Sequence, residues 1–162
     1  MRSTISPRQT LYLEEDLTRF KAKQAKKRLE QVTSKANVKA FHEQILENNV
    51  YLLKADIVFD CAQDNSITEM IAKQCKQEKT PLIIVRTTGL TYTVLASTKQ
   101  IPPKTLQTLP LPNYSEEGIH GITTHAAAST AVSEAYKIIL GQKNAHIIIG
   151  NAWTGSTKAS KF

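Results

Sequence analysis

One stretch of ten residues decides the fold: Asp56-Ile57-Val58-Phe59-Asp60-Cys61-Ala62-Gln63-Asp64-Asn65. Its first half has the apolar character of a buried strand, and the loop that follows carries the carboxylates of Asp60 and Asp64. Ser66 and Glu69 match a capping box, which predicts a helix from Ser66 to about Lys79. In an open α/β sheet, ligands bind where strands end and helices begin. Asp64 is therefore a candidate to hold Mg²⁺ or to steer a phosphate, while Asp60 is a candidate to orient the loop.

Strands and one long helix are expected after this first helix. Residues 81–85 form a continuous apolar run, which is typical of a strand covered on both faces. Gly89 then turns the chain into an antiparallel strand at residues 91–96. The remaining sequence predicts a Pro-rich crossover loop at 98–117, a small-residue helix at 118–140, and a closing β-hairpin of residues 146–149 and 156–160.

Before the decisive stretch, the sequence predicts an amphipathic helix at residues 14–32, a strand at 38–42 and a short helix at 49–53. In a doubly wound sheet of order 3-2-1-4-5, residues 38–42 would be the third strand and 56–60 the fourth. Both of their natural neighbours are then absent, and unpaired buried amides cost about 1–3 kcal/mol each. Either the two strands pair directly in a rearranged sheet, or another chain fills the gap. We therefore expect a homo-oligomer, or a partner chain that completes the sheet.

Length and composition limit the classes of protein that this chain can represent. A chain of 162 residues with 41% apolar residues suits one α/β domain over residues 1–162. The net charge is +7, and residues 1–40 carry ten Lys or Arg against four acids. This basic segment is either a solvated helix face or a surface for phosphates or an acidic protein. With no long apolar run and no signal peptide, we expect a soluble protein of the cytoplasm, or else of the nucleus.

The cysteines and histidines suggest no metal site. Cys61 and Cys75 form no CxxC pair, so we expect two buried thiols and no zinc. His120 and His125 are four residues apart, but the sequence shows no further ligands beside them. Satisfied or exposed histidines are therefore expected.

Several strings together resemble the ThiF/MoeB/ubiquitin-activating family of adenylating enzymes. The segment from Arg8-Gln9 through Tyr12–Leu17 to Lys21-Ala22 is similar to the family's R-Q-x-L-F…D-x-G-K-x-K-A pattern. Asp64-Asn65 is similar to its magnesium-binding D-N step, and Ala131–Phe162 to its closing helix and strands. The resemblance covers nearly the whole chain and implies a Rossmann-like adenylation fold with a mixed, mostly parallel sheet, truncated at the N-terminus.

The resemblance also implies a chemistry. Family members use ATP to adenylate the C-terminal carboxylate of a ubiquitin-like protein. It implies that Arg8 and Lys21 contact ATP phosphates and that Asp64, followed by Asn65, holds Mg²⁺. Read from the sequence alone, Lys21 and Arg8 are equally consistent with solvated charges on a basic segment.

Departures from the family pattern favour a non-catalytic subgroup. No Gly-rich GxGGxG turn is present, Ile5 stands where the family has Asn, and residues 98–117 contain no cysteine for a thioester. The segment Pro81–Leu90 and the extra residue between Asp60 and Asp64 resemble the non-catalytic subunits of heterodimeric activating enzymes. This implies a heterodimer with a catalytic subunit, a ubiquitin-like protein as further partner, and no binding of ATP and Mg²⁺ by this chain alone.

Two alternatives to that subunit remain open. One is an adenylating enzyme whose Gly-rich half is supplied in trans or by another subunit. The other is a basic polyanion-binding module, for which the few aromatic residues (6%) offer little base stacking. Nucleic acid is therefore the least expected partner.

Overall fold

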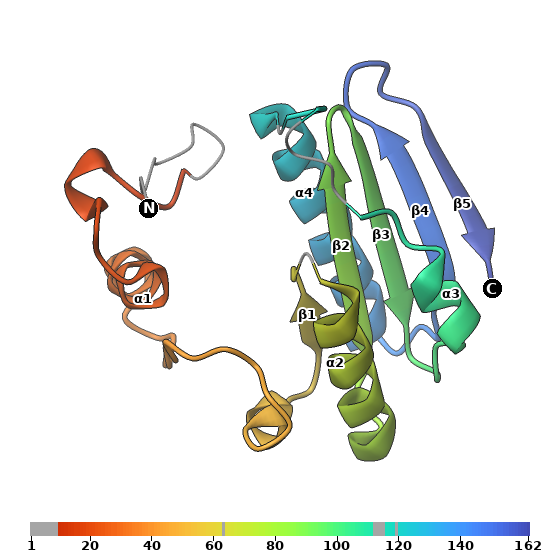
Figure 1. Ribbon diagram of the computed structural model, residues 1–162, viewed down its shortest axis with the longest axis horizontal. Helices are drawn as coiled ribbons and strands as arrows, with labels where there is room; N and C mark the ends of the chain where they lie inside the picture. Colours follow the sequence, from red (N-terminus) through yellow and green to blue (C-terminus); the bar gives the residue numbers. More distant parts are fainter. Residues whose placement is uncertain (1–9, 63, 112–115, 119) are drawn as a thin grey trace. The chain divides into compact units, whose positions relative to one another are not determined.

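The computed structural model describes residues 10–62, 64–111, 116–118 and 120–162 (Figure 1). These residues belong to two compact units, of which the first spans Met1–Gln44 and the second Ile45–Phe162. Within the described ranges, no helix is long and apolar enough to cross a membrane.

The first unit contains a 3-10 turn, η1 (Glu14–Asp16), and a basic helix, α1 (Lys21–Val32). The prediction of one helix over residues 14–32 is therefore wrong. The Asp16 carboxylate accepts a hydrogen bond from the Leu13 N–H at 2.9 Å and so closes η1 on itself. Thr18 then adopts a φ of 72°, which an α-helix does not contain. The acids that suggested a helix start instead belong to this separate turn.

The predicted strand at residues 38–42 is also wrong, because this segment is irregular and is part of none of the strands in the described ranges. Its end is held by an aromatic contact instead. The His42 ring packs on the Phe20 ring with centroids 3.8 Å apart and the planes inclined by 36°. Alternation over five residues was thus too short a signal to identify a strand.

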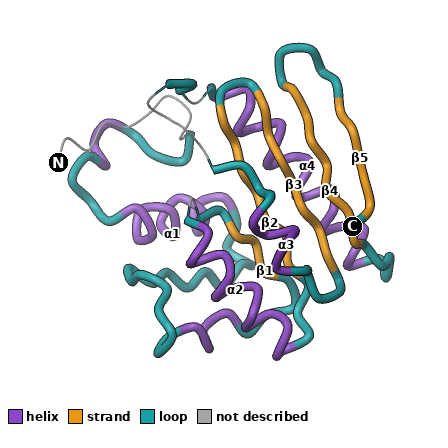
Figure 2. The backbone as a smooth tube through the Cα atoms, turned by 45° about the vertical axis from the view of Figure 1, so that its right-hand side comes forward, coloured by secondary structure: helices purple, strands orange, loops and turns teal. Residues whose placement is uncertain are grey.

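The second unit holds a five-stranded sheet with helices on both faces (Figures 1 and 2). In chain order its elements are η2 (Val50–Leu53), β1 (Val58–Asp60), α2 (Asn65–Glu78), β2 (Leu82–Thr88), β3 (Thr91–Ser97), α3 (Pro103–Gln107), α4 (Gly121–Ile139), β4 (Ala145–Asn151) and β5 (Thr157–Lys161). The expected α/β fold, closing helix and β-hairpin are confirmed.

The strands lie in the sheet in chain order, β1-β2-β3-β4-β5. β1 pairs parallel with β2 across the α2 crossover, whereas the other three neighbouring pairs are antiparallel. The expectation of a mostly parallel sheet is therefore wrong for this chain. Two of the antiparallel pairs are hairpins, and Gly89 and Gly155, with φ of 50° and 68°, lie in their turns.

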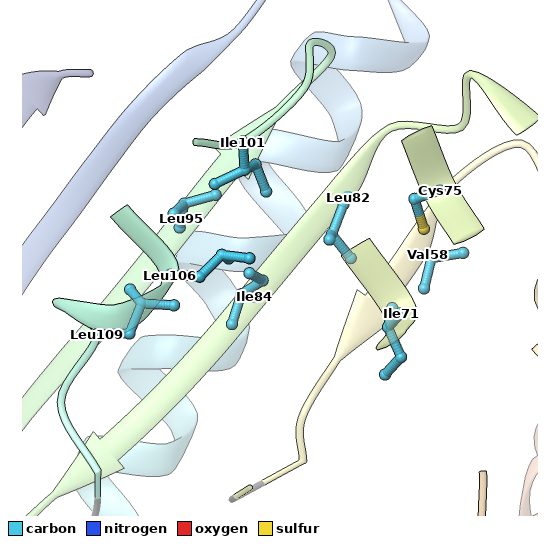
Figure 3. Close-up of a cluster of buried hydrophobic side chains, with 9 residues drawn as sticks. All are labelled: Val58, Ile71, Cys75, Leu82, Ile84, Leu95, Ile101, Leu106 and Leu109. Carbon is cyan, nitrogen blue, oxygen red and sulfur yellow. The ribbon is translucent and has the colours of Figure 1, made fainter. Parts of the chain in front are cut away.

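Two apolar layers enclose the sheet, as the uninterrupted apolar run of β2 predicted. On one face Leu82 and Ile84 pack beneath α2 and α3 (Figure 3). On the other face Ile83 packs against α4. Neighbouring residues of β2 thus belong to opposite cores, which is the alternation that a strand imposes.

The segment expected as a crossover loop contributes to the first of these cores. Residues 98–117 contain the short helix α3, with Pro103 at its first turn. Ile101, Leu106 and Leu109 are buried against Leu82, Ile84 and Leu95 (Figure 3). The Pro-rich composition concealed a helix because proline is favourable at a helix start.

The small residues of α4 allow the helix to lie close to the sheet. Ala127, Ala131 and Ala135 are buried and pack on a layer that includes Ile83, Val94 and Ala96. Their spacing of four residues places them on one face of the helix. The prediction that the alanines of this helix permit close packing is confirmed.

We expect Ala131→Leu to lower the free energy of unfolding by about 1–3 kcal/mol, because the added carbons overfill a packed interface. Urea unfolding followed by circular dichroism measures this loss. Ser133→Leu is the control, because it places leucine on an exposed position of the same helix and should change stability by less than about 0.5 kcal/mol. Equal losses in both variants would contradict close packing of α4 on the sheet.

Candidate functional site

The loop that joins β1 to α2 carries the predicted site residue Asp64. Asp64 is the N-cap of α2, and its Oδ1 accepts hydrogen bonds from Ser66 N (2.7 Å), Ser66 Oγ (2.6 Å) and Ile67 N (3.3 Å). The prediction that Ser66 caps the helix is therefore wrong, and the helix starts at Asn65. These hydrogen bonds lower the pKa of Asp64. The Ser66 hydroxyl has the largest effect, and the two backbone N–H donors add to it. Its carboxylate is thus oriented, exposed and charged at neutral pH.

Asp60 ends β1 and is buried, with 1% of its surface exposed. Its Oδ1 accepts a hydrogen bond from Ala62 N at 2.8 Å, and its Oδ2 accepts one from Thr68 Oγ1 at 2.6 Å. One carboxylate therefore holds both the first turn of the loop and the first turn of α2. This geometry supports the alternative in which Asp60 orients the loop.

Arg86 of β2 completes this arrangement, and the sequence analysis did not identify it. It is also 1% exposed, and its Nη2 lies 3.4 Å from Asp60 Oδ2 and donates to Thr68 Oγ1. Its Nη1 donates to Val85 O at 3.1 Å, while its buried Nε has no hydrogen-bond partner among the described residues. The sequence feature that could have identified Arg86 is its position as a single cation at the end of the apolar run of β2. A buried charge requires a partner, so such a cation predicts a buried acid nearby.

The other predicted cofactor residues are distributed over the chain. Arg8 lies outside the described residues. Lys21 is the exposed first residue of α1, in the first unit, so it and Asp64 belong to different units. Asn65 follows Asp64 directly, and its buried Oδ1 lacks a hydrogen-bond partner in the described part of the chain. The structure therefore joins Asp64 and Asn65 in one site, and the roles of Arg8 and Lys21 stay predictions.

The donor set at Asp64 suits a shared metal site better than a metal site made by protein alone. No group of three or more His, Cys, Asp or Glu that could hold a metal occurs within the described ranges. Mg²⁺ in nucleotide enzymes usually takes one or two carboxylates and completes its shell with phosphates and water. Asp64 fits such a role only where nucleotide phosphates supply the remaining ligands.

The two thiols differ from their predicted environments. Cys75 is buried, as expected, and desolvation raises its pKa to about 11. Cys61 is exposed, so the prediction of two buried thiols is wrong. It nevertheless lines an apolar groove. Its pKa is raised, mainly by desolvation and to a smaller extent by the negative charge of Asp60. Neither thiol has the lowered pKa that distinguishes a cysteine nucleophile.

His146, the first residue of the strand predicted at 146–149, belongs to a second buried polar cluster. Its Nε2 lies 3.0 Å from Oε2 of Glu134, which is 1% exposed. Asn144 Nδ2 donates to the same oxygen at 2.9 Å, and Lys137 Nζ lies 2.5 Å from Oε1. These contacts tie the end of α4 to the start of β4. The buried Glu134 therefore has a structural role, which is to hold α4 against the start of β4.

An apolar groove of about 470 Å³ borders the site on the other face of the sheet. Phe59 and Cys61 line it from β1 and the loop, Val85 from β2, and Ala128 and Val132 from α4. Phe59 is 45% exposed, and β1 pairs with β2 alone among the described strands. Among the described strands of the second unit, the outer edge of β1 is therefore unpaired, as the sequence led us to expect.

We expect Arg86→Met to lower the free energy of unfolding by about 3–5 kcal/mol, because it leaves the Asp60 carboxylate buried without its cation. Urea unfolding measures the loss. The double variant Asp60→Asn with Arg86→Met removes both charges and should recover part of the stability. An Arg86→Met chain as stable as the wild type would contradict a structural role for the pair.

We expect Asp64→Ala to lower the urea midpoint at pH 7, because α2 loses its cap. Since contacts lower the folded-state pKa of Asp64 from 3.8, its stabilisation is present above pH 3.8 and is lost as pH falls through the folded-state value. The difference between wild type and Asp64→Ala should therefore shrink in acid. Asp64→Asn is the control, because asparagine also caps helices and should retain most of the midpoint. A difference that stays constant with pH would contradict the role of the ionised cap.

Comparisons with known proteins show to which family this chain belongs. The model of the ThiF family matches residues 6–159. A search of curated proteins found no match. Among solved structures, E. coli MccB with ATP is similar to this chain with a TM-score of 0.76 and 16% identity, over 99% of this chain and 54% of that one.

Two further solved structures show the same fold. E. coli MccB with selenomethionine MccA gives a TM-score of 0.75 at 14% identity, over 94% of this chain and 50% of that one. PaaA gives 0.69 at 13% identity, again over 94% and 50%. The chain thus spans about half the length of the structures that it matches. Because the family model covers nearly all of its residues, the chain belongs to the ThiF family.

Proposed function

We propose that this chain is a non-catalytic, partner-dependent adenylation-like subunit that supports the activation of a ubiquitin-like protein. The observation that carries the proposal is that β1, whose end bears the Asp64 loop, pairs with β2 alone among the described strands, so that only one side of a ligand site is present there. Ligands of α/β sheets bind at such strand ends, between two neighbouring parts of the fold. This chain supplies one side of that crevice.

Adenylation of a carboxylate requires more groups than this side of the crevice contains. In acyl-adenylate formation a carboxylate attacks the α-phosphorus of ATP, and cations neutralise the developing negative charge. When bound, Mg²⁺ would supply such a cation, with Asp64 as its protein ligand and phosphates completing its shell. Asp60, Thr68 and Arg86 hold the loop in place but are buried, so they act as positioning residues.

An adenylating enzyme whose Gly-rich half comes from another chain is the alternative. It is favoured by the ATP-bound MccB structure among the similar proteins and by the exposed, charged Asp64. In that case Asp64 contributes directly to the reaction. In the non-catalytic subunit it only caps α2.

The ion pairs of the first unit weigh against the polyanion-binding alternative. Arg28 Nη2 lies 3.0 Å from Glu15 and 3.4 Å from Asp16, and Lys26 pairs with Glu30 at 3.3 Å. Part of the positive charge of α1 is therefore matched within the unit. This leaves less charge for phosphates than the sequence suggested.

ATP–pyrophosphate exchange separates the proposed subunit from the enzyme. We expect no exchange by this chain alone, and a higher rate when it is added to a candidate catalytic subunit that carries the Gly-rich turn and its ubiquitin-like substrate. Asp64→Asn keeps the helix cap but removes the charge. We expect it to stimulate exchange as well as the wild type does, and Asp56→Asn, which alters an exposed aspartate before β1, is the matched control.

Two results would overturn the proposal. A loss of about 10²-fold with Asp64→Asn but not with Asp56→Asn would identify Asp64 as part of the catalytic machinery and favour the enzyme. No stimulation by the wild type, despite measured binding to the catalytic subunit, would contradict a supporting role.

A further inference from the structure

The fold of the second unit separates charges that the sequence mixes. Residues 45–162 carry eleven Lys or Arg against nine acids, so this part of the chain is nearly neutral by composition. In the structure, Asp60 and Glu134 are buried in ion pairs. Asp64 starts α2 beside the candidate site, and Glu117 binds Thr88 at the end of β2. The acids are therefore buried or lie toward one end of the sheet, which leaves the opposite end to lysines.

The strand register brings four strand ends at that opposite end to one level. Leu82 at the start of β2 pairs with Ser97 at the end of β3, and Ser97 pairs with Ala145 at the start of β4. Lys161 at the end of β5 pairs with His146, the second residue of β4. Paired residues stand side by side across a sheet, so these ends form one border, toward which β3 and β5 run downward in Figure 1.

Exposed lysines follow this border, and we call them the lysine border: Lys76, Lys79, Lys99, Lys143 and Lys161. Lys99 and Lys143 are neighbours, because Thr98 N and Oγ1 both donate to Asn144 O, at 2.9 and 3.2 Å. Within the described ranges, none of the five belongs to an ion pair. The acids Asp56 and Glu78 also lie near this end, but the lysines exceed them.

Helix electrostatics explains only one of these lysines. Lys76 lies in the last turn of α2, where a cation complements the helix dipole. Lys99, Lys143 and Lys161 lie at strand ends, which have almost no net dipole to complement. Their collection at one level therefore requires another explanation.

An exposed aliphatic side chain projects beside the lysine border. α4 runs toward this border, and Glu134 is level with it because the Glu134 carboxylate binds Asn144 and His146. The helix continues to Leu140, its C-cap residue, about 9 Å further along the axis. Leu140 is 76% exposed. The same end of the unit thus combines level cations with a protruding apolar residue.

The counterpart of this surface must be negatively charged and broad. Residues 1–44 carry ten Lys or Arg against five acids, and a second copy would present the same lysines, so neither supplies negative charge. α2 and α4 pack on opposite faces of the sheet. The lysines of α2 and the leucine of α4 are therefore spread over a plane rather than along a line. An anionic membrane surface is such a plane, and it accepts lysines among its headgroups and an aliphatic side chain below them.

We propose that this end of the second unit, formed by the lysine border and Leu140, binds the surface of an anionic membrane. The lysines lie at the level of the lipid headgroups, and Leu140 enters the interface. The candidate site is at the other end of the unit, so it stays accessible while the chain is bound. The inference goes beyond the proposed function and does not rest on it.

Vesicle sedimentation with the full chain tests the proposal. The chain is mixed with vesicles of phosphatidylcholine and phosphatidylserine at about 3:1, and separately with vesicles of phosphatidylcholine alone. We expect binding to the anionic vesicles only, and release as the salt concentration rises. A lysine near an anionic surface contributes about fivefold to binding, so the triple variant Lys99→Gln, Lys143→Gln, Lys161→Gln should bind about 100-fold more weakly.

The matched control removes three charges from the first unit. Lys27→Gln, Lys35→Gln and Lys39→Gln together alter exposed lysines and lower the net charge by the same amount. We expect this variant to bind the anionic vesicles within about threefold of the wild type. Circular dichroism verifies that both triple variants are folded.

A second pair of variants tests the apolar contact. Leu140→Ser should weaken binding to the anionic vesicles by about fivefold, because a partly inserted leucine is lost. Val32→Ser is its control, because Val32 is 82% exposed at the end of α1 in the first unit. It should leave binding unchanged.

Four outcomes would overturn the proposal. They are no binding to anionic vesicles, equal binding to both kinds of vesicle, an equal loss in the two triple variants, and an equal loss in Leu140→Ser and Val32→Ser. Binding to soluble poly-glutamate without binding to the vesicles would assign the lysine border to an acidic protein, and would also overturn it. ATP–pyrophosphate exchange is measured without vesicles, so a failure of the proposed function leaves this test unaffected.

Discussion

The buried ion pair between Asp60 and Arg86 is the contact on which the candidate site depends. It joins β1 to β2 within the sheet, and Thr68 brings α2 into the same cluster. Both charged side chains are almost fully buried, so each needs the other because an unpaired charge is costly in a protein interior. The pair fixes where β1 ends. It thereby determines where the loop leaves the sheet and where Asp64 meets α2.

The rest of the second unit holds this corner in position. α2 and α3 cover one face of the sheet, α4 covers the other, and Glu134 ties the end of α4 to β4. These layers hold the end of β1 and the start of α2 in place beside a strand edge that is unpaired among the described strands. Such an arrangement presents a ligand corner without enclosing it.

The basic first unit illustrates how tertiary contacts alter the meaning of a charge pattern. Arg28 contributes to the positive charge of α1, yet it binds the acids of η1 within the same unit. Asp16 is held by the Leu13 N–H and by Arg28, which together lower its pKa despite its burial. A net charge read from the sequence therefore overstates the charge available to a partner.

The sequence alone determined the α/β class, the resemblance to the ThiF family, the strand and hairpin order after Asp56, and the position of Asp64 at a strand end. These features follow from local patterns, because periodicity, turn residues and short motifs are properties of neighbouring residues. The tertiary structure alone decided that Arg86 pairs with Asp60, that Asp64 rather than Ser66 caps α2, and that residues 38–42 form no strand. It also decided that only β1 and β2 pair parallel, whereas the other neighbouring pairs of the sheet are antiparallel. The Arg86–Asp60 pair joins residues far apart in the chain, and no local pattern specifies such a partner. The cap of α2 is a local contact, but two neighbouring residues could each have supplied it, and only the structure shows that Asp64 does.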